Sequence, residues 1–184
     1  MRGLSARPRW RLHAALGALA TAMVACVQEP TALRTDVQTY MKRMASWGPI
    51  EAETARTLER ILATEFVDEA EVGHQIADSR PRIQAHLAQV RAVTPKTDAV
   101  RHVHTLYLDA WDRLLRGYDA IEKGFATAEY SNLAQGREAM GAWRDGIMAV
   151  ARELRELARR VGVDPGAMLE SAWLSSPSSR VQST

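Results

Sequence analysis

The sequence predicts an all-α protein, an antiparallel four-helix bundle that follows an N-terminal signal segment. Over most of the chain apolar residues recur at spacings of three and four, which places them on one face of a helix. No stretch shows the strict alternation of apolar and polar residues that is typical of a half-buried strand. The breaks between helical segments are short, and short connections favour helices that fold back on each other.

Residues 1–25 have the organisation of a secretory signal. The first residues include four arginines and no acidic residue. They are followed by the apolar run LHAALGALATAMVA, and small residues precede Cys26. Met23-Val24-Ala25-Cys26 is similar to the bacterial lipobox, in which the cysteine is acylated through sulfur and becomes the new amino terminus. The chain has one cysteine, so no intramolecular disulfide explains it. We expect Cys26 to be the lipid attachment site and residues 26–32 to be a tether.

Two other interpretations of Cys26 remain open. The cysteine is incidental if an ordinary leader is cleaved after Ala18-Leu19-Ala20. The segment is an uncleaved anchor if it crosses the membrane, but Leu12 to Val27 is 16 residues long, and a membrane-spanning helix needs about 20.

The net charge of the mature chain gives no reason to expect nucleic acid as a partner. The chain has 24 basic and 22 acidic residues, and four of the arginines lie in residues 1–25. The remainder therefore carries a formal charge of about −2 and has no clustered basic face.

The predicted bundle spans residues 33–163. Its first helix has Leu33, Val37, Tyr40, Met44 and Trp47 on one face. Thr31 is its predicted cap, and Gly48-Pro49 is its predicted end. A second helix starts near Ile50, with Glu51 and Glu53 in its first turn, where acidic residues are favourable.

This second helix is expected to be broken near Gly73 to Pro81. Asp78-Ser79-Arg80-Pro81 is typical of a cap followed by a first-turn proline, so a new helical piece is predicted there. It turns Ile83, Leu87 and Val90 inward and ends at Thr94-Pro95.

The third long helix is predicted from Thr97 to Phe125, and the fourth extends to Val161. The third has two adjoining apolar stripes, which indicates contacts on more than one side. The fourth has a heptad seam that starts at Leu133. That seam would also suit an oligomeric coiled coil, but the short loops favour a monomer. Residues 164–174 are predicted as a short helix and 175–184 as a disordered tail.

The candidate metal and catalytic patterns are weak. Glu71 and His74 have the Glu-x-x-His spacing of di-iron bundles, but the pattern occurs once. His102 and His104 lie on different faces of a helix, so they cannot share an ion. The sequence has no Gly-x-Ser-x-Gly elbow, phosphate loop, haem motif or His-Glu-x-x-His. We therefore expect no cofactor, no metal and no enzymatic activity.

The predicted inward stripes contain histidine and aromatic side chains with polar groups. Such side chains line small-molecule pockets in bundles, although they also pack cores. If the protein has a ligand pocket, the sequence predicts it between the third and fourth long helices, at His104, Tyr107, Trp111 and Trp143.

Residues 102–163 resemble the last two helices of a group of uncharacterised bacterial lipoproteins with a helical-bundle domain. His104, Tyr107, Leu114 and Gly117 carry this resemblance, which covers about a third of the chain. It implies a lipid-anchored bundle and brings no catalytic residues with it.

Together these observations predict a cell-envelope lipoprotein. Acyl chains on Cys26, such as palmitate, are expected to hold it to the membrane. Its expected role is that of a protein-interaction or assembly module with an envelope protein partner. The alternative is a small-ligand-binding bundle. Val27 after the cysteine favours the outer membrane in a cell with two membranes.

Overall fold

The computed structural model describes the backbone of residues 11–64 and 68–164, and the side chains of that part from Pro30 onward. It contains four helices: α1 (Arg11–Ala63), α2 (Glu69–Arg91), α3 (Asp98–Thr127) and α4 (Tyr130–Arg160). The described residues form no strand. The predicted all-α four-helix bundle is therefore confirmed. The side chain of Cys26 and the predicted elements in residues 165–184 lie outside the described residues.

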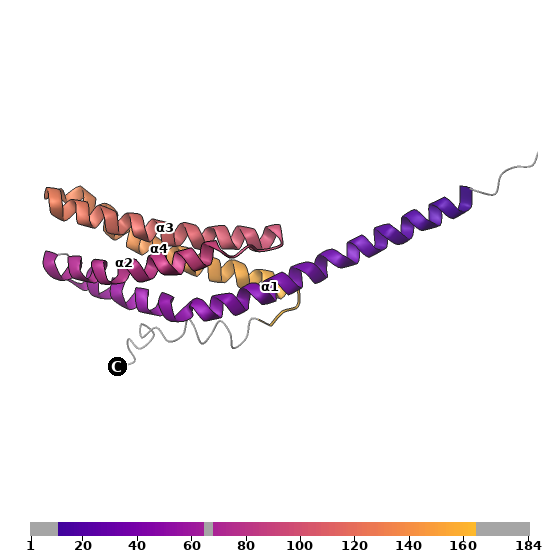
Figure 1. The fold of residues 1–184 in the computed structure, drawn as a ribbon, viewed down its shortest axis with the longest axis horizontal. Coiled ribbons are helices and arrows are strands. Elements are labelled where there is room, and N and C mark those ends of the chain that lie inside the picture. The colour runs from indigo at the N-terminus through magenta and orange to yellow at the C-terminus, as the bar shows by residue number, and fades with distance from the viewer. Residues whose placement is uncertain (1–10, 65–67, 165–184) are drawn as a thin grey trace, which may run out of the picture.

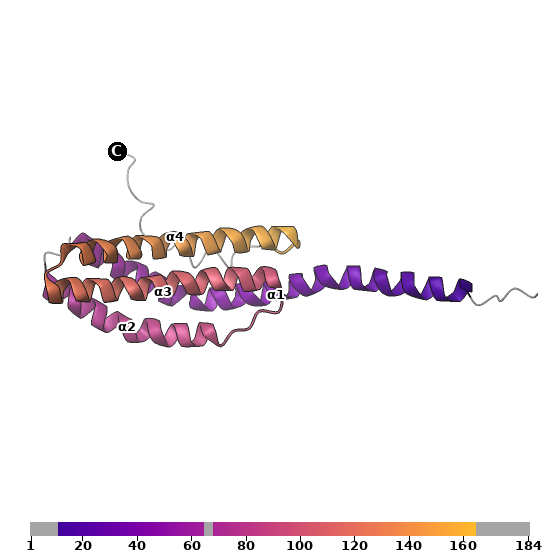
Figure 2. The same ribbon diagram turned by 90° about the horizontal axis from the view of Figure 1, so that it is seen from above.

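Successive helices run in opposite directions along one long axis (Figures 1 and 2). α1 is the longest helix, and it extends out of the bundle at the end where α2 connects to α3. The start of α3 and the end of α4 lie at this same end. The amino-terminal side of α1 therefore enters the bundle next to the α2–α3 loop.

The predicted helix end at Gly48-Pro49 is wrong, because α1 continues through both residues. Thr31 likewise lies inside α1 and does not cap it. A proline within a helix removes one backbone hydrogen bond and costs about 3 kcal/mol or more. Met44, before the proline, and Leu58 and Ile61, after it, are all buried in one core. Each such side chain contributes roughly 1.5–3 kcal/mol by its burial, so together they outweigh the loss.

The predicted break near Gly73 to Pro81 is also wrong, since α2 starts at Glu69 and continues through Pro81. Its N-cap is Asp68, whose Oδ1 accepts a hydrogen bond from the Glu71 N–H at 3.0 Å. Asp78, the predicted cap, instead pairs with His74 at 3.0 Å. The chain thus has one break in this region, between α1 and α2.

α3 and α4 form the most closely packed hairpin of the bundle. Glycines on the facing sides of these two helices leave no room for a side chain. A Cβ on Gly117 would lie 2.8 Å from the Ala139 Cβ, and one on Gly146 would lie 2.9 Å from the Ala110 Cβ. A Cβ on Gly136 would lie 2.9 Å from the Gly117 carbonyl oxygen. The short α3–α4 connection includes Ala128, with a positive φ of 55°.

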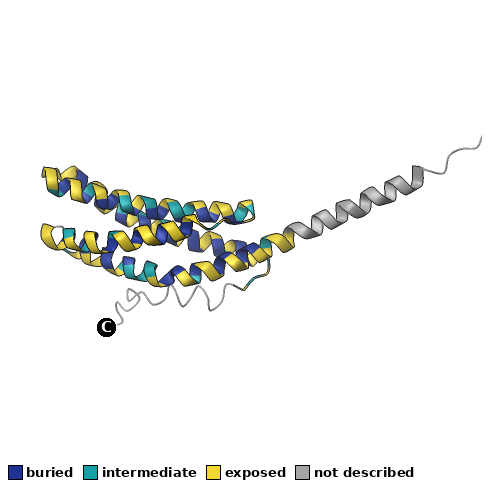
Figure 3. Ribbon diagram, viewed as in Figure 1, coloured by how far each residue is buried: buried dark blue, intermediate teal, exposed yellow. Residues whose placement is uncertain are grey.

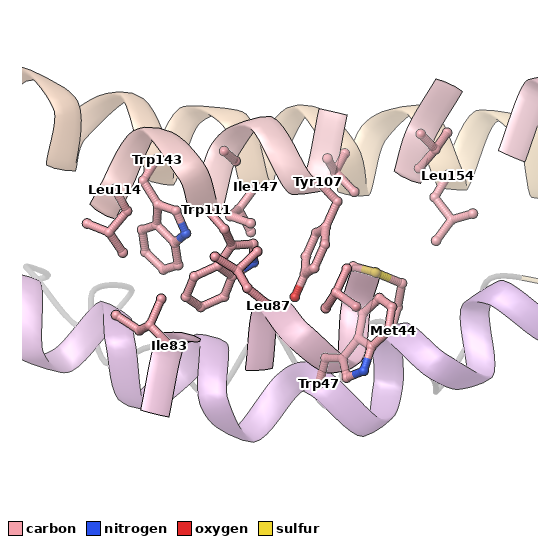
Figure 4. Packing of buried hydrophobic residues seen from close by; sticks show 14 of the residues in the cluster. Met44, Trp47, Ile83, Leu87, Tyr107, Trp111, Leu114, Trp143, Ile147 and Leu154 are labelled. Atoms are coloured by element: carbon pink, nitrogen blue, oxygen red, sulfur yellow. The ribbon is translucent and has the colours of Figure 1, made fainter. Parts of the chain in front are cut away.

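The core runs along the inner faces of all four helices, and the outer faces are exposed (Figure 3). Aromatic rings fill its centre. Trp111 of α3 has its ring 5.3 Å from that of Trp143 of α4, and Trp47 of α1 stacks on Tyr107 at 5.2 Å (Figure 4). Most residues of the inward stripes predicted for α3 and α4 are buried, and the others are half-buried.

Candidate functional site

The four residues predicted to form a pocket are all buried in this aromatic core. His104 is 7% exposed, Tyr107 and Trp111 are 0% exposed and Trp143 is 3% exposed. Tyr107, Trp111 and Trp143 follow one another in ring contact. His104 contacts a different partner, Tyr40 of α1, with its Nδ1 3.3 Å from the tyrosine hydroxyl. The structure thus places the four residues in one core, where they pack against further residues of α1 and α2.

A buried carboxyl group lies beside these rings. The Tyr107 hydroxyl donates to Glu51 Oε1 at 2.7 Å, and His86 Nε2 lies 2.9 Å from the same hydroxyl. Because the hydroxyl proton points to Glu51, the hydroxyl oxygen accepts from His86, which requires the Nε2–H tautomer. Glu51 Oε2 is buried and makes no hydrogen bond to the described residues. The arrangement is a chain of hydrogen bonds from α2 through α3 to α1.

Burial sets the protonation of this chain. Desolvation raises the pKa of Glu51 to about 7, although the hydrogen bond from Tyr107 acts in the opposite direction. Desolvation also lowers the pKa of His86 to about 4, lowers that of His104 and raises that of Tyr107. His86 is therefore neutral near pH 7, and Glu51 is shared between its acid and carboxylate forms.

Glu51 and His86 were not among the residues predicted for a site. Glu51 was predicted to lie in the first turn of a helix that begins near Ile50, and this position depended on the wrong helix end at Gly48-Pro49. Once α1 is continuous, Glu51 lies four residues after Trp47 on the buried face. His86 lies three residues after Ile83, so the helical spacing of α2 indicates its burial as well.

The structure has a groove of about 720 Å³ at the end of the bundle where α1 enters. One wall belongs to α1, and the other is the loop that joins α2 to α3. The α1 wall consists of Thr31, Ala32, Thr35, Asp36, Thr39, Tyr40 and Arg43. The volume of the groove is in the range of small-molecule sites. Tyr40 also bonds His104, so the groove reaches the edge of the aromatic core.

The loop wall of the groove is held in place by hydrogen bonds. Asp36 Oδ2 accepts from the backbone N–H groups of Lys96 and Thr97 at 2.9 and 2.8 Å. The Arg101 guanidinium donates to the Lys96 carbonyl at 2.9 Å. The two walls therefore form a preorganised site.

A second cavity, of about 360 Å³, lies between α1 and α2 and is lined in part by Trp47 and His86. None of the four residues predicted for a pocket lines this cavity or the groove. The groove and this cavity are thus formed by α1, α2 and the loop that follows α2, whereas the pocket was predicted between the third and fourth long helices.

The described residues contain no cluster of three or more histidine, cysteine or acidic residues suited to a metal ion. His74 is exposed and pairs with Asp78, while Glu71 accepts a hydrogen bond from Gln75 at 2.5 Å. In the described part of the chain, no helix combines the length and hydropathy needed to cross a membrane. Comparison with protein-family models, curated proteins and solved structures gives no match for this chain.

Proposed function

We propose that this protein is a lipid-anchored cell-envelope protein that binds a small ligand in the groove between α1 and the α2–α3 loop. The groove is the observation that carries the proposal. It has the volume of a small-molecule site, its loop wall is fixed by Asp36 and Arg101, and hydroxyl, cationic and apolar groups line it together.

A protein-assembly role, the first expectation from the sequence, needs a docking surface. Large exposed apolar patches are typical of such surfaces. The large hydrophobic side chains that the described residues expose are Tyr130 and Met148. Since the groove offers convergent polar groups at one place, it supports ligand binding better than these two side chains support docking.

The lipid anchor is tested by the intact mass of the protein extracted from bacterial membranes. We expect the wild-type mass to equal residues 26–184 plus acyl chains, and we expect the Cys26→Ser variant to lose this form. An unmodified wild-type mass would contradict the anchor.

Ligand binding is tested by native mass spectrometry of the protein extracted from the same membranes. Thr35→Trp places a large ring in the groove and should abolish any bound small molecule. Thr105→Trp is the matched control, because Thr105 is an exposed α3 residue whose hydroxyl donates to the carbonyl four residues earlier, as that of Thr35 does. Equal ligand content in both variants would rule the groove out.

A further inference from the structure

Two cationic side chains, Arg43 of α1 and Lys96 of the α2–α3 loop, lie on opposite walls of the groove. Both residues are exposed, and neither side chain makes an ion pair with the described residues. Other arginines of the bundle, such as Arg80 and Arg91, are paired with acidic residues. The groove thus offers two cations that are available to an anionic ligand, and a guanidinium binds phosphate oxygens in a bidentate manner.

Asp36 is the acidic residue in the groove wall, and its Oδ2 accepts hydrogen bonds from residues at the end of the α2–α3 loop. It is 6% exposed, and its Oδ2 accepts from Lys96 N, Thr97 N and Thr97 Oγ1 at 2.8 to 2.9 Å. These donors lie at the start of α3, where the helix dipole favours negative charge. Asp36 therefore fixes the loop that carries Lys96, and the start of α3 stabilises its negative charge.

The groove also has an apolar part. Ala32 of α1 and Ala92, Val93 and Pro95 of the loop form this part of the lining. An inorganic anion would contact only the cations and hydroxyls, whereas an amphiphile with an anionic head would use both parts. The lining therefore favours an amphiphile with an anionic head.

The proposed anchor would keep this groove near a bilayer. Four residues lie between Cys26 and Thr31, and the five residue steps from one to the other span at most about 18 Å. Building on the proposed function, we infer that the groove binds the headgroup of an anionic phospholipid, with Arg43 and Lys96 on its phosphate. The protein then holds a lipid of the membrane to which it is anchored.

The test measures lipid adducts by native mass spectrometry on the full acylated protein in detergent. We expect phosphatidylglycerol to bind at least tenfold more tightly than phosphatidylcholine. The Arg43→Gln/Lys96→Gln variant should lose at least tenfold in affinity for phosphatidylglycerol. Lys42→Gln/Lys123→Gln is the control, because it removes the same charge at exposed positions outside the groove lining, and it should stay within twofold of wild type. Because all four positions are exposed, circular dichroism should show unchanged folding.

Five results would overturn this inference. Equal binding of the two lipids would remove the preference for an anionic head, and equal losses in the two double variants would remove the role of the groove cations. Free glycerol phosphate that binds as tightly as phosphatidylglycerol would assign the site to a soluble phosphate compound. If Thr35→Trp abolishes lipid adducts that Arg43→Gln/Lys96→Gln retains, the phosphate contact is wrong and the proposed function stands. If Thr35→Trp also retains them, both proposals fail.

Discussion

Glu51 and His86 both make the stability of this protein depend on pH, and their effects have opposite signs. The pKa of Glu51 is raised from 4.5 to about 7 in the folded state, so its contribution is fully present below pH 4.5 and is lost as pH rises through about 7. The pKa of His86 is lowered from 6.5 to about 4, so its contribution is present above pH 6.5 and is lost as pH falls through about 4. The two effects therefore oppose each other between about pH 4.5 and 6.5.

Replacing Glu51 by Gln should separate these effects. Gln keeps an acceptor for the Tyr107 hydroxyl but does not ionise, so the variant should gain stability relative to wild type as pH rises from 5 to 8. We expect a relative gain of about 1–3 kcal/mol over this range, from the size of the shift. Urea denaturation at each pH measures it, with the exposed Glu59→Gln as control. A difference between Glu51→Gln and wild type that does not change with pH would contradict the buried acid.

Trp111 should act as a core residue and not as a ligand contact. Its ring lies 4.8 Å from that of His86 and 5.3 Å from that of Trp143, and the side chain is 0% exposed. Trp111→Ala should lower the free energy of unfolding by about 3–5 kcal/mol, the typical cost of such a cavity. Urea denaturation measures this loss. An effect on ligand binding with full stability retained would show that Trp111 belongs to the site instead.

The helices were predictable from apolar spacing, but their ends were not. Glycine and proline weaken a helix locally, and at Gly48-Pro49 and at Pro81 that local signal predicted breaks. In the fold both positions lie in helices whose faces are buried on each side of the proline, and this packing outweighs the local cost. The prediction thus failed where tertiary packing overrides local propensity, and it succeeded for α3 and α4, which contain no proline.

The candidate site was predictable only in part for a related reason. Spacing alone identified His104 and Tyr107 as inward-facing. Their partners Tyr40, Glu51 and His86 come from other helices, and no local pattern pairs them. The groove depends on the loop after α2 lying against α1, which follows from the assembled bundle. A sequence pattern could therefore indicate buried polar residues but not the opening beside them.

The close approach of α3 and α4 should make their glycines differ in tolerance to alanine. A Cβ on Gly136 would overlap the Gly117 carbonyl oxygen and the Ile121 side chain, whereas one on Gly141 would meet nothing within 4 Å. Overpacking costs about 1–3 kcal/mol, and alanine regains up to about 1 kcal/mol of helix propensity. Gly136→Ala should therefore destabilise the protein, and Gly141→Ala should stabilise it by up to about 1 kcal/mol. Thermal denaturation of both variants checks this, and a shift of the same sign in both would contradict the packing.

In the bundle as a whole, α2 is tied to its neighbours by ion pairs at the surface. The Arg80 guanidinium lies 2.7 Å from Asp119 and 2.8 Å from Glu122, both on α3. Arg91 pairs with Asp112 of α3 at 2.5 Å, and Arg82 pairs with Glu53 of α1. The acidic partners are at least one-third exposed, so each pair contributes only about 0.2–1 kcal/mol and is weakened by salt. The glycine contacts between α3 and α4 involve no charges and should not respond to salt.

Hydrogen exchange should therefore show that salt loosens α2 selectively. Between 0.05 and 1 M NaCl we expect α2 amides to exchange about two- to tenfold faster, because loss of the ion pairs lowers the cost of local opening. Amides of α3 and α4 should change little. Arg80→Gln removes two of the contacts and should abolish much of the salt effect, whereas Arg113→Gln, at an exposed position with no ion pair among the described residues, should preserve it. Equal acceleration in all helices would mean that α2 opens only when the whole bundle unfolds, and its ion pairs would then have no separate role.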